Sequence, residues 1–158
     1  MSDKFDINVD SEIGRLTGEI LHTPGRELSN MTPETAERAL YSDILNLAVA
    51  NEEYQQLQGV LEQRCRGFQI RDLLADILAN DRVRGGLVRR ICEAEEVPDI
   101  ADGLLALEAG ELARVLIEGV ALVKDNLSRF LSGDRYSLPP LHNFFFTRDA
   151  AVSVSGKV

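Results

Sequence analysis

Near its C-terminal end the sequence reads Pro139-Pro140-Leu141-His142-Asn143-Phe144-Phe145-Phe146-Thr147-Arg148-Asp149. The two prolines fix φ and favour an extended backbone, and the aromatic residues after them are strong strand formers. We therefore expect a rigid approach followed by a strand over residues 144–147. In an ideal strand Asn143 and Asp149 share a face but lie about 20 Å apart, at about 3.3 Å per residue. Both reach one small ligand only if the segment bends. The alternative is an aromatic core strand that ends in a surface Arg and Asp.

The preceding residues predict a mixed α/β chain. Ile13–Leu21 has the pattern of a strand, and a turn rich in Pro and Gly follows it. Thr32 is the expected N-cap of a first helix, and Asp43 that of a second, longer one. Gly67 is expected to end the second helix in a left-handed conformation, ahead of a short strand over residues 68–70. This order of helix and strand predicts a crossover unit.

Residues 72–123 predict four short helices, with almost no strand signal between them. The expected boundaries are Asp72 as a cap and Asn80-Asp81, Pro98 and Gly110 as breaks. We interpret this stretch as a helical subdomain inserted into an α/β module. That module would comprise residues 1–71 and 124–158, with the polar segment 124–138 returning the chain to the sheet.

Composition narrows the class of protein. The chain has 158 residues, 44% of them hydrophobic, which suffices for a globular core. A net charge of −9 argues against nucleic acid and anionic membranes as partners, although simple solubility also explains it. No apolar run approaches the length of a membrane span, the N-terminus has no signal-peptide core, and the cysteines form no disulfide framework. We expect a cytoplasmic protein without a metal or other cofactor, because phosphate-loop and zinc spacings are absent.

The stretch from Asn143 to Asp149 resembles the Asn-x-x-Phe-Thr-Arg-Asp signature of the arginine deiminase family. These are guanidine-modifying enzymes with the pentein propeller fold. Three further stretches agree in the family's order: Glu12-Ile13-Gly14-Arg15-Leu16, Leu21-His22-Thr23-Pro24-Gly25, and Met31-Thr32-Pro33 followed by Leu40-Tyr41-Ser42-Asp43-Ile44-Leu45. The family usually has Arg at the position of Thr23, Asp at that of Ser42 and Pro at that of His142.

The resemblance implies the first part of a pentein α/β-propeller and a guanidino substrate. Hydrolysis of a guanidinium to a ureido group and ammonia needs carboxylates to hold the cation, a thiolate to attack and an acid/base to move protons. The resemblance implies that Asp149 binds the guanidinium and that Asn143 binds the substrate's α-carboxylate or nearby polar groups. It also implies that Phe146 and Leu40 contact the aliphatic part of the substrate. For Leu40, a plain place in a helix core is an equal alternative.

The resemblance also implies that the catalytic Cys and His lie downstream of this chain, so we expect no catalytic residue here. Cys65 lies between two arginines, which favour a thiolate, but at a helix C-terminus, which opposes it. Cys92 has acidic neighbours. We expect both to be structural, and we assign no catalytic role to His22 or His142.

Two functions follow as hypotheses. The first is the N-terminal part of an arginine deiminase-like enzyme, inactive alone, which pairs with the rest of the enzyme or associates with itself through an unpaired strand near its end. The second is a non-catalytic binding or interaction module that keeps the family's first structural unit. The sequence does not choose between arginine, agmatine and methylated arginines, or between hydrolysis and amidino transfer.

Overall fold

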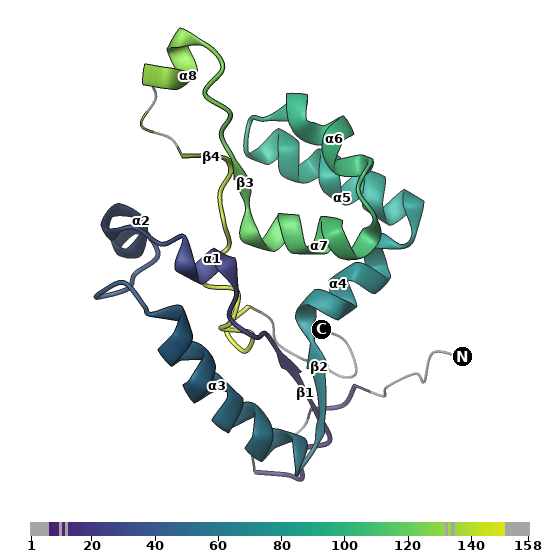
Figure 1. Ribbon diagram of the computed structural model, residues 1–158. Helices are drawn as coiled ribbons and strands as arrows, with labels where there is room; N and C mark the ends of the chain where they lie inside the picture. Colours follow the sequence, from purple (N-terminus) through teal and green to yellow (C-terminus); the bar gives the residue numbers. More distant parts are fainter. Residues whose placement is uncertain (1–6, 10, 12, 132, 134, 151–158) are drawn as a thin grey trace.

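The computed structural model describes residues 7–9, 11, 13–131, 133 and 135–150. Helices dominate the described residues, and the strands form two small two-stranded sheets (Figure 1). The elements are β1 (Gly18–Leu21), α1 (Arg26–Ser29), α2 (Pro33–Arg38), α3 (Leu47–Glu62), β2 (Arg66–Gln69), α4 (Ile70–Leu78), α5 (Asp81–Ala94), the 3₁₀ turn η1 (Pro98–Ile100), α6 (Ala101–Leu105), α7 (Ala109–Glu118), β3 (Val120–Ala121), α8 (Leu127–Leu131) and β4 (Tyr136–Leu138). The mixed α/β class is confirmed. The unpaired strand expected near the end of the chain falls outside the described residues.

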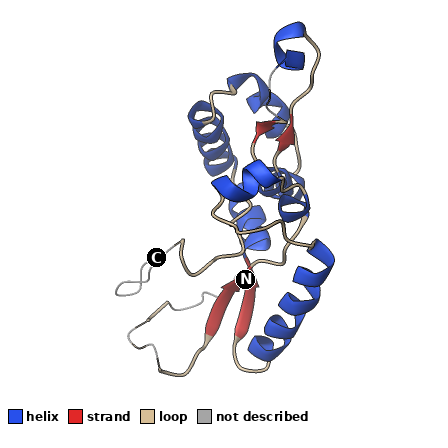
Figure 2. Cartoon of the chain, turned by 90° about the vertical axis from the view of Figure 1, so that its left-hand side faces the viewer, coloured by secondary structure: helices blue, strands red, loops and turns tan. Residues whose placement is uncertain are grey.

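The first sheet is a parallel pair. β1 and β2 align with Gly18 opposite Arg66 and Ile20 opposite Phe68, and the chain between them runs through α1, α2 and α3. Figure 2 shows the two strands side by side, with α3 alongside them. The predicted crossover unit is therefore confirmed, although its first strand is shorter than expected.

The glycine beside this sheet has a different role from the one predicted. α3 ends at Glu62 with Gln63 as a right-handed C-cap, whereas Gly67 lies in β2 opposite Glu19. A Cβ at Gly67 would lie 3.2 Å from Leu21 Cδ1, so the absent side chain leaves room for the neighbouring strand. The prediction that Gly67 ends the helix was wrong. Close packing of the strands, and not a left-handed φ, explains the glycine at this position.

Helix caps show where local chemistry decides the structure. Thr32 caps α2 as predicted, and it exchanges hydrogen bonds with Thr35 in a capping box. α3 is capped by Asn46, whose Oδ1 accepts hydrogen bonds from the N–H groups of Ala48 and Val49. Asp43 instead accepts the N–H of the next residue, 2.7 Å away, in the preceding loop. The predicted Asp43 cap was therefore wrong by three residues.

Four helices follow β2, as predicted for this part of the chain. α4 to α7 enclose an apolar cluster of buried side chains: Leu78, Val88, Cys92, Leu104, Leu112, Ala113, Leu116 and Leu138. Asn80 caps α5, which agrees with a helix boundary there. Other boundaries differ: Ile70 starts α4 and is not in the strand, Asp72 lies in the first turn of α4, Gly110 lies inside α7, and Pro98 begins η1. The separation of residues 72–123 as a subdomain stays a prediction.

Gly119, between α7 and β3, packs closely against the backbone at the start of the proline segment. Gly119 follows α7 with φ +83°, a conformation that residues with a side chain rarely adopt. An added Cβ would lie 2.7 Å from Leu138 O and 2.8 Å from Pro140 N. The backbone N–H of Leu141 also donates to Ile117 O at 2.9 Å. These contacts fix the point from which the chain enters the segment that resembles the family signature.

The second sheet carries an arm that projects from the body of the molecule. β3 and β4 are antiparallel, with Val120 opposite Leu138 and Ala121 opposite Tyr136. The chain between them includes α8, which lies away from the other helices (Figure 1). The polar segment 124–138, predicted to return the chain to the sheet, contains the short helix α8 and the strand β4.

The aromatic stretch is not a strand. The N–H groups of Phe144, Phe146 and Asp149 donate to carbonyls three residues earlier, those of Leu141, Asn143 and Phe146, at 3.1, 3.1 and 3.3 Å. The stretch is thus a series of turns, and the expected alternation of faces does not apply to it. Strand propensity fails here because no described strand pairs with this segment, and tertiary contacts set its shape.

Candidate functional site

A groove of about 580 Å³ lies between α2 and the segment that begins at Pro139. Its lining residues include the acidic Glu34 and Glu95 and the basic Arg38 and Arg135. Threonines and aromatic residues also line it. Such a surface suits a small ligand that itself carries both charges and an apolar stem.

The structure brings two of the four sequence-predicted residues to this groove. Asn143 and Phe146 line it, and the Nδ2 of Asn143 donates to Ala39 O at 3.2 Å. This bond ties the turn segment to the end of α2. Asp149 is exposed and is not among the lining residues, although its neighbour Ala150 is.

Leu40, the fourth predicted residue, is 92% exposed and does not line the groove. It follows the C-cap Ala39 with φ 64°. Its N–H donates to Glu37 O, and the N–H of Tyr41 donates to Ala36 O, which is the Schellman arrangement that usually places Gly at this position. Helix termination therefore accounts for the backbone of Leu40, and the helix-core alternative does not fit its exposure.

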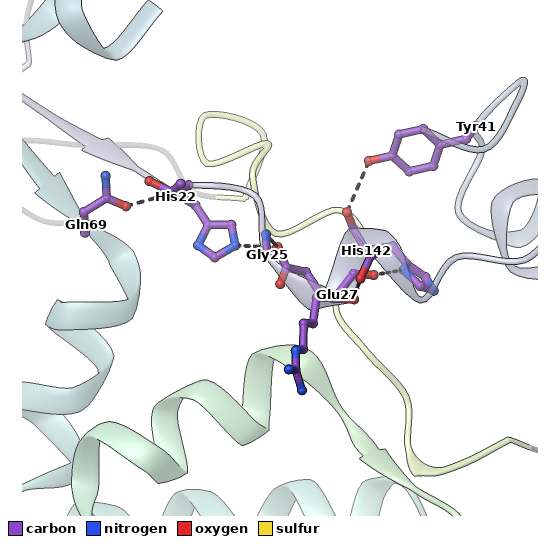
Figure 3. Close-up of polar contacts among 9 residues, drawn as sticks. His22, Gly25, Glu27, Tyr41, Gln69 and His142 are labelled. Carbon is purple, nitrogen blue, oxygen red and sulfur yellow. Dashed lines mark hydrogen bonds and ion pairs between the residues drawn. The ribbon is translucent and has the colours of Figure 1, made fainter. Parts of the chain in front are cut away.

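Beside the groove lies a buried carboxylate that the sequence did not single out. Glu27 is 1% exposed, and its Oε1 accepts hydrogen bonds from the N–H of Gly25 and from Nε2 of His22, at 2.5 and 3.0 Å (Figure 3). Burial raises the pKa of Glu27, but the hydrogen bonds from His22 and the backbone outweigh it and bring the pKa below its ordinary value. Glu27 is therefore ionised near neutral pH, and it fixes the turn that leads into α1.

The same residue holds the turn segment through its backbone. The Nδ1 of the buried His142 lies 2.6 Å from Glu27 O, and a carbonyl only accepts, so Nδ1 carries the hydrogen. The carbonyl of His142 in turn accepts from the hydroxyl of Tyr41 at 3.2 Å, as Figure 3 shows. Burial raises the pKa of Tyr41 to about 12, so this hydroxyl stays a donor. We call these four residues, His22, Glu27, Tyr41 and His142, the Glu27 network.

Aromatic contacts also hold the turn segment, residues 139–150, in place. Phe144 meets the ring of His22 edge-on at 5.1 Å between centroids, and Phe146 stacks on Tyr41 at 6.1 Å. Phe145 packs against the buried cluster of Leu28, Met31 and Ala36. One aromatic residue thus serves the core while its neighbour Phe146 faces the groove.

Comparison with known proteins agrees with the sequence motifs. No family model matches the chain. The chain is 33% identical to an arginine deiminase of Limosilactobacillus fermentum over 162 residues, 32% identical to one of Pediococcus pentosaceus, and 31% identical to one of Borreliella burgdorferi. These matches confirm the resemblance to the arginine deiminase family. They cover 94–96% of this chain, which spans about 40% of the length of these relatives.

The two cysteines of this chain, Cys65 and Cys92, are free thiols. Burial, and next the nearby Glu19, raise the pKa of Cys65. Burial, and next Asp99, raise the pKa of Cys92, which lies in the apolar cluster of the helices. The arginines that flank Cys65 therefore do not activate it, and neither thiol has the low pKa of a nucleophile.

The described residues hold few other candidate functional groups. None of their His, Cys, Asp and Glu side chains gather in threes where a metal ion would bind. In the same part of the chain, no helix is both apolar and long enough to span a bilayer. Glu27 and Tyr41 were not predicted as site residues, although Glu27 closely follows the His-x-Pro-Gly turn and Tyr41 stands in a stretch that resembles the family.

Proposed function

We propose that this chain forms part of the substrate site of an arginine deiminase-like enzyme and that the groove binds a guanidino compound such as arginine. The observation that carries the proposal is the place of Asn143 and Phe146, which resemble the family signature and both line the groove. Both signs of charge in the same groove match an amino acid with a cationic side chain.

Each group has a role in this proposal. A guanidinium is a planar set of N–H donors, which a carboxylate meets with two hydrogen bonds. Asp149 remains our candidate for this contact, since it is exposed next to groove-lining Ala150. Asn143 would bind the polar end of the ligand, and Phe146 and Leu40 would contact its aliphatic stem.

The larger assembly belongs to the same proposal. Residues 1–71 and 124–158 would form one module of a propeller, with residues 72–123 inserted as a helical subdomain. The parallel pair β1–β2 and the apolar cluster built mainly from α4 to α7 support this division. A longer cytoplasmic enzyme would supply the thiolate that attacks the guanidinium carbon and would release citrulline and ammonia.

Calorimetry with the purified chain tests the proposal. Arginine should give saturable heat, and citrulline, which lacks the cationic group, should bind at least about tenfold more weakly because a charged hydrogen-bonded pair is lost. The variants Asn143→Ala and Asp149→Asn should both weaken arginine binding. Equal heats for arginine and citrulline, or unchanged affinity in both variants, would contradict the proposal.

A second function is a non-catalytic module that binds a guanidino compound and does no chemistry. The raised pKa values of Cys65 and Cys92 favour it, because neither thiol is prepared to attack. Both functions predict arginine binding without citrulline release by this chain alone. Citrulline release after the remaining part of an arginine deiminase is added would favour the enzyme over the module.

A further inference from the structure

The Glu27 network joins two distant parts of the chain at the groove. The Glu27 carboxylate holds Gly25 and His22 ahead of α1, and its carbonyl accepts from His142, 115 positions later. The next residue after His142 is the groove-lining Asn143. The network thus acts at the first residue of the turn that presents the predicted ligand contacts.

We propose that His142 and Glu27 are positioning residues: together they set the shape of the turn over residues 141–146, so that Asn143 and Phe146 face the groove. The ligand part of this inference rests on the proposed function. The family usually has Pro where this chain has His142, so here a hydrogen-bonded side chain replaces a rigid ring.

The contacts distinguish this role from general packing. His142 is bound at both ends, with its ring on Glu27 O and its carbonyl on the hydroxyl of Tyr41. The two turn hydrogen bonds that follow, from Phe144 to Leu141 and from Phe146 to Asn143, depend on where this residue is held. The apolar cluster of α4 to α7 contains neither Glu27 nor His142. Loss of the contacts of His142 should therefore make the turn over residues 141–146 open more often and leave the helices α4 to α7 folded.

A pair of matched variants tests the role of His142. His142→Leu removes the donor at similar size, whereas His142→Asn keeps an N–H donor near the position of Nδ1. Amide hydrogen exchange at Phe144 and Phe146 should accelerate on the order of tenfold in His142→Leu, the effect of one lost buried hydrogen bond on a local opening. In His142→Asn it should stay within about threefold of the parent. Amides of α5 and α7 should exchange at the parent rate in both variants, which shows that the chain is folded.

A second pair of variants tests the role of Glu27. Glu27→Leu removes the acceptor of His22 and Gly25 and should accelerate exchange at the same two turn amides, whereas Glu27→Gln keeps an acceptor oxygen and should do so less. Arginine affinity, measured by calorimetry, should fall in the order parent, His142→Asn, His142→Leu.

The outcomes separate this inference from the proposed function. If the parent binds no arginine, the proposed function fails, and the exchange rates still decide whether the network sets the turn. Turn amides that exchange at the parent rate in His142→Leu and Glu27→Leu would overturn the inference. Where the parent binds arginine, equal affinity in the parent and His142→Leu would overturn it as well.

Discussion

The helical cluster of α4 to α7 and the turn segment over residues 139–150 are stabilised in different ways. The cluster is held by apolar side chains such as Leu78, Val88 and Leu112, each 0% exposed. The turn segment is held by single hydrogen bonds to α1, α2 and β1, and by aromatic contacts. Apolar burial is non-directional and tolerates small shifts, whereas a hydrogen bond requires a defined geometry. Changes in the cluster should therefore alter stability, and changes in the segment should alter the shape of the groove.

The largest effect should come from a cavity in the cluster. Leu112→Ala should lower the free energy of unfolding by about 3 kcal/mol, because it removes a fully buried side chain. Urea unfolding followed by circular dichroism measures this loss. Leu127, 72% exposed on α8, is the matched control, and Leu127→Ala should change stability by less than about 0.5 kcal/mol. Equal effects of the two variants would contradict the assigned core.

The second-largest loss of stability should come from Gly119, where the end of α7 packs against the turn segment. Gly119→Ala places a Cβ 2.7 Å from Leu138 O at φ +83°, and it should destabilise the chain by about 2 kcal/mol. Gly86, in α5, has open space around it, so Gly86→Ala should stabilise by about 0.5 kcal/mol through helix propensity. Thermal unfolding of both variants tests whether Gly119→Ala lowers stability and Gly86→Ala raises it. A stabilising Gly119→Ala would refute the close approach of Gly119 to Leu138 and Pro140.

A smaller effect should come from the charge of Glu27. Glu27→Gln removes the charge from two hydrogen bonds and should cost about 1 kcal/mol at neutral pH. The folded-state pKa of Glu27 lies below the ordinary value of 4.5, so its contribution is complete above that pH and is lost as the pH falls through the folded-state pKa. Urea unfolding from pH 7 into acid should show the parent and the variant converging. A constant difference would mean that the charge of Glu27 contributes nothing.

The smallest effect should be at the end of α2. Leu40→Gly relieves a left-handed conformation at an exposed residue but gives the unfolded chain more freedom, for a net stabilisation of about 0.5 kcal/mol. Ile13→Gly, at a 97% exposed position without positive φ, should not stabilise the chain. Calorimetry with arginine separates the roles of Leu40: weaker binding in Leu40→Gly would support its proposed contact with substrate, and unchanged binding would leave it only as a helix terminator.

The two regions also differ in what the sequence predicted. The four helices after β2 were predicted because their apolar periodicity reflects a cluster built mainly from neighbouring turns of chain. Thr32 was identified because it is a good N-cap residue and Pro33 follows it at the first helical position, so the signal is local. The predicted strand over residues 144–147 was wrong because the partners of this segment are far away in the sequence. Asn143 Nδ2 donates to Ala39 O, and Thr147 Oγ1 donates to Ile20 O at 2.8 Å.

The candidate site divides in the same way. Motif resemblance found Asn143 and Phe146, which line the groove, and it found the similarity to arginine deiminases that the comparisons confirmed. It did not find Glu27, whose importance comes from burial and from partners on both sides of the chain. Side-chain roles that depend on long-range contacts have no local pattern to reveal them.

Four hydrogen bonds of the turn segment have partners 101, 104, 115 and 127 positions earlier in the chain. Bringing such distant residues together costs loop-closure entropy, which the intervening helices reduce once they are folded. The signature is therefore not a portable module. A peptide cut from residues 139–150, or a graft of it onto another scaffold, would carry every letter of the motif and lack the partners that give it a shape.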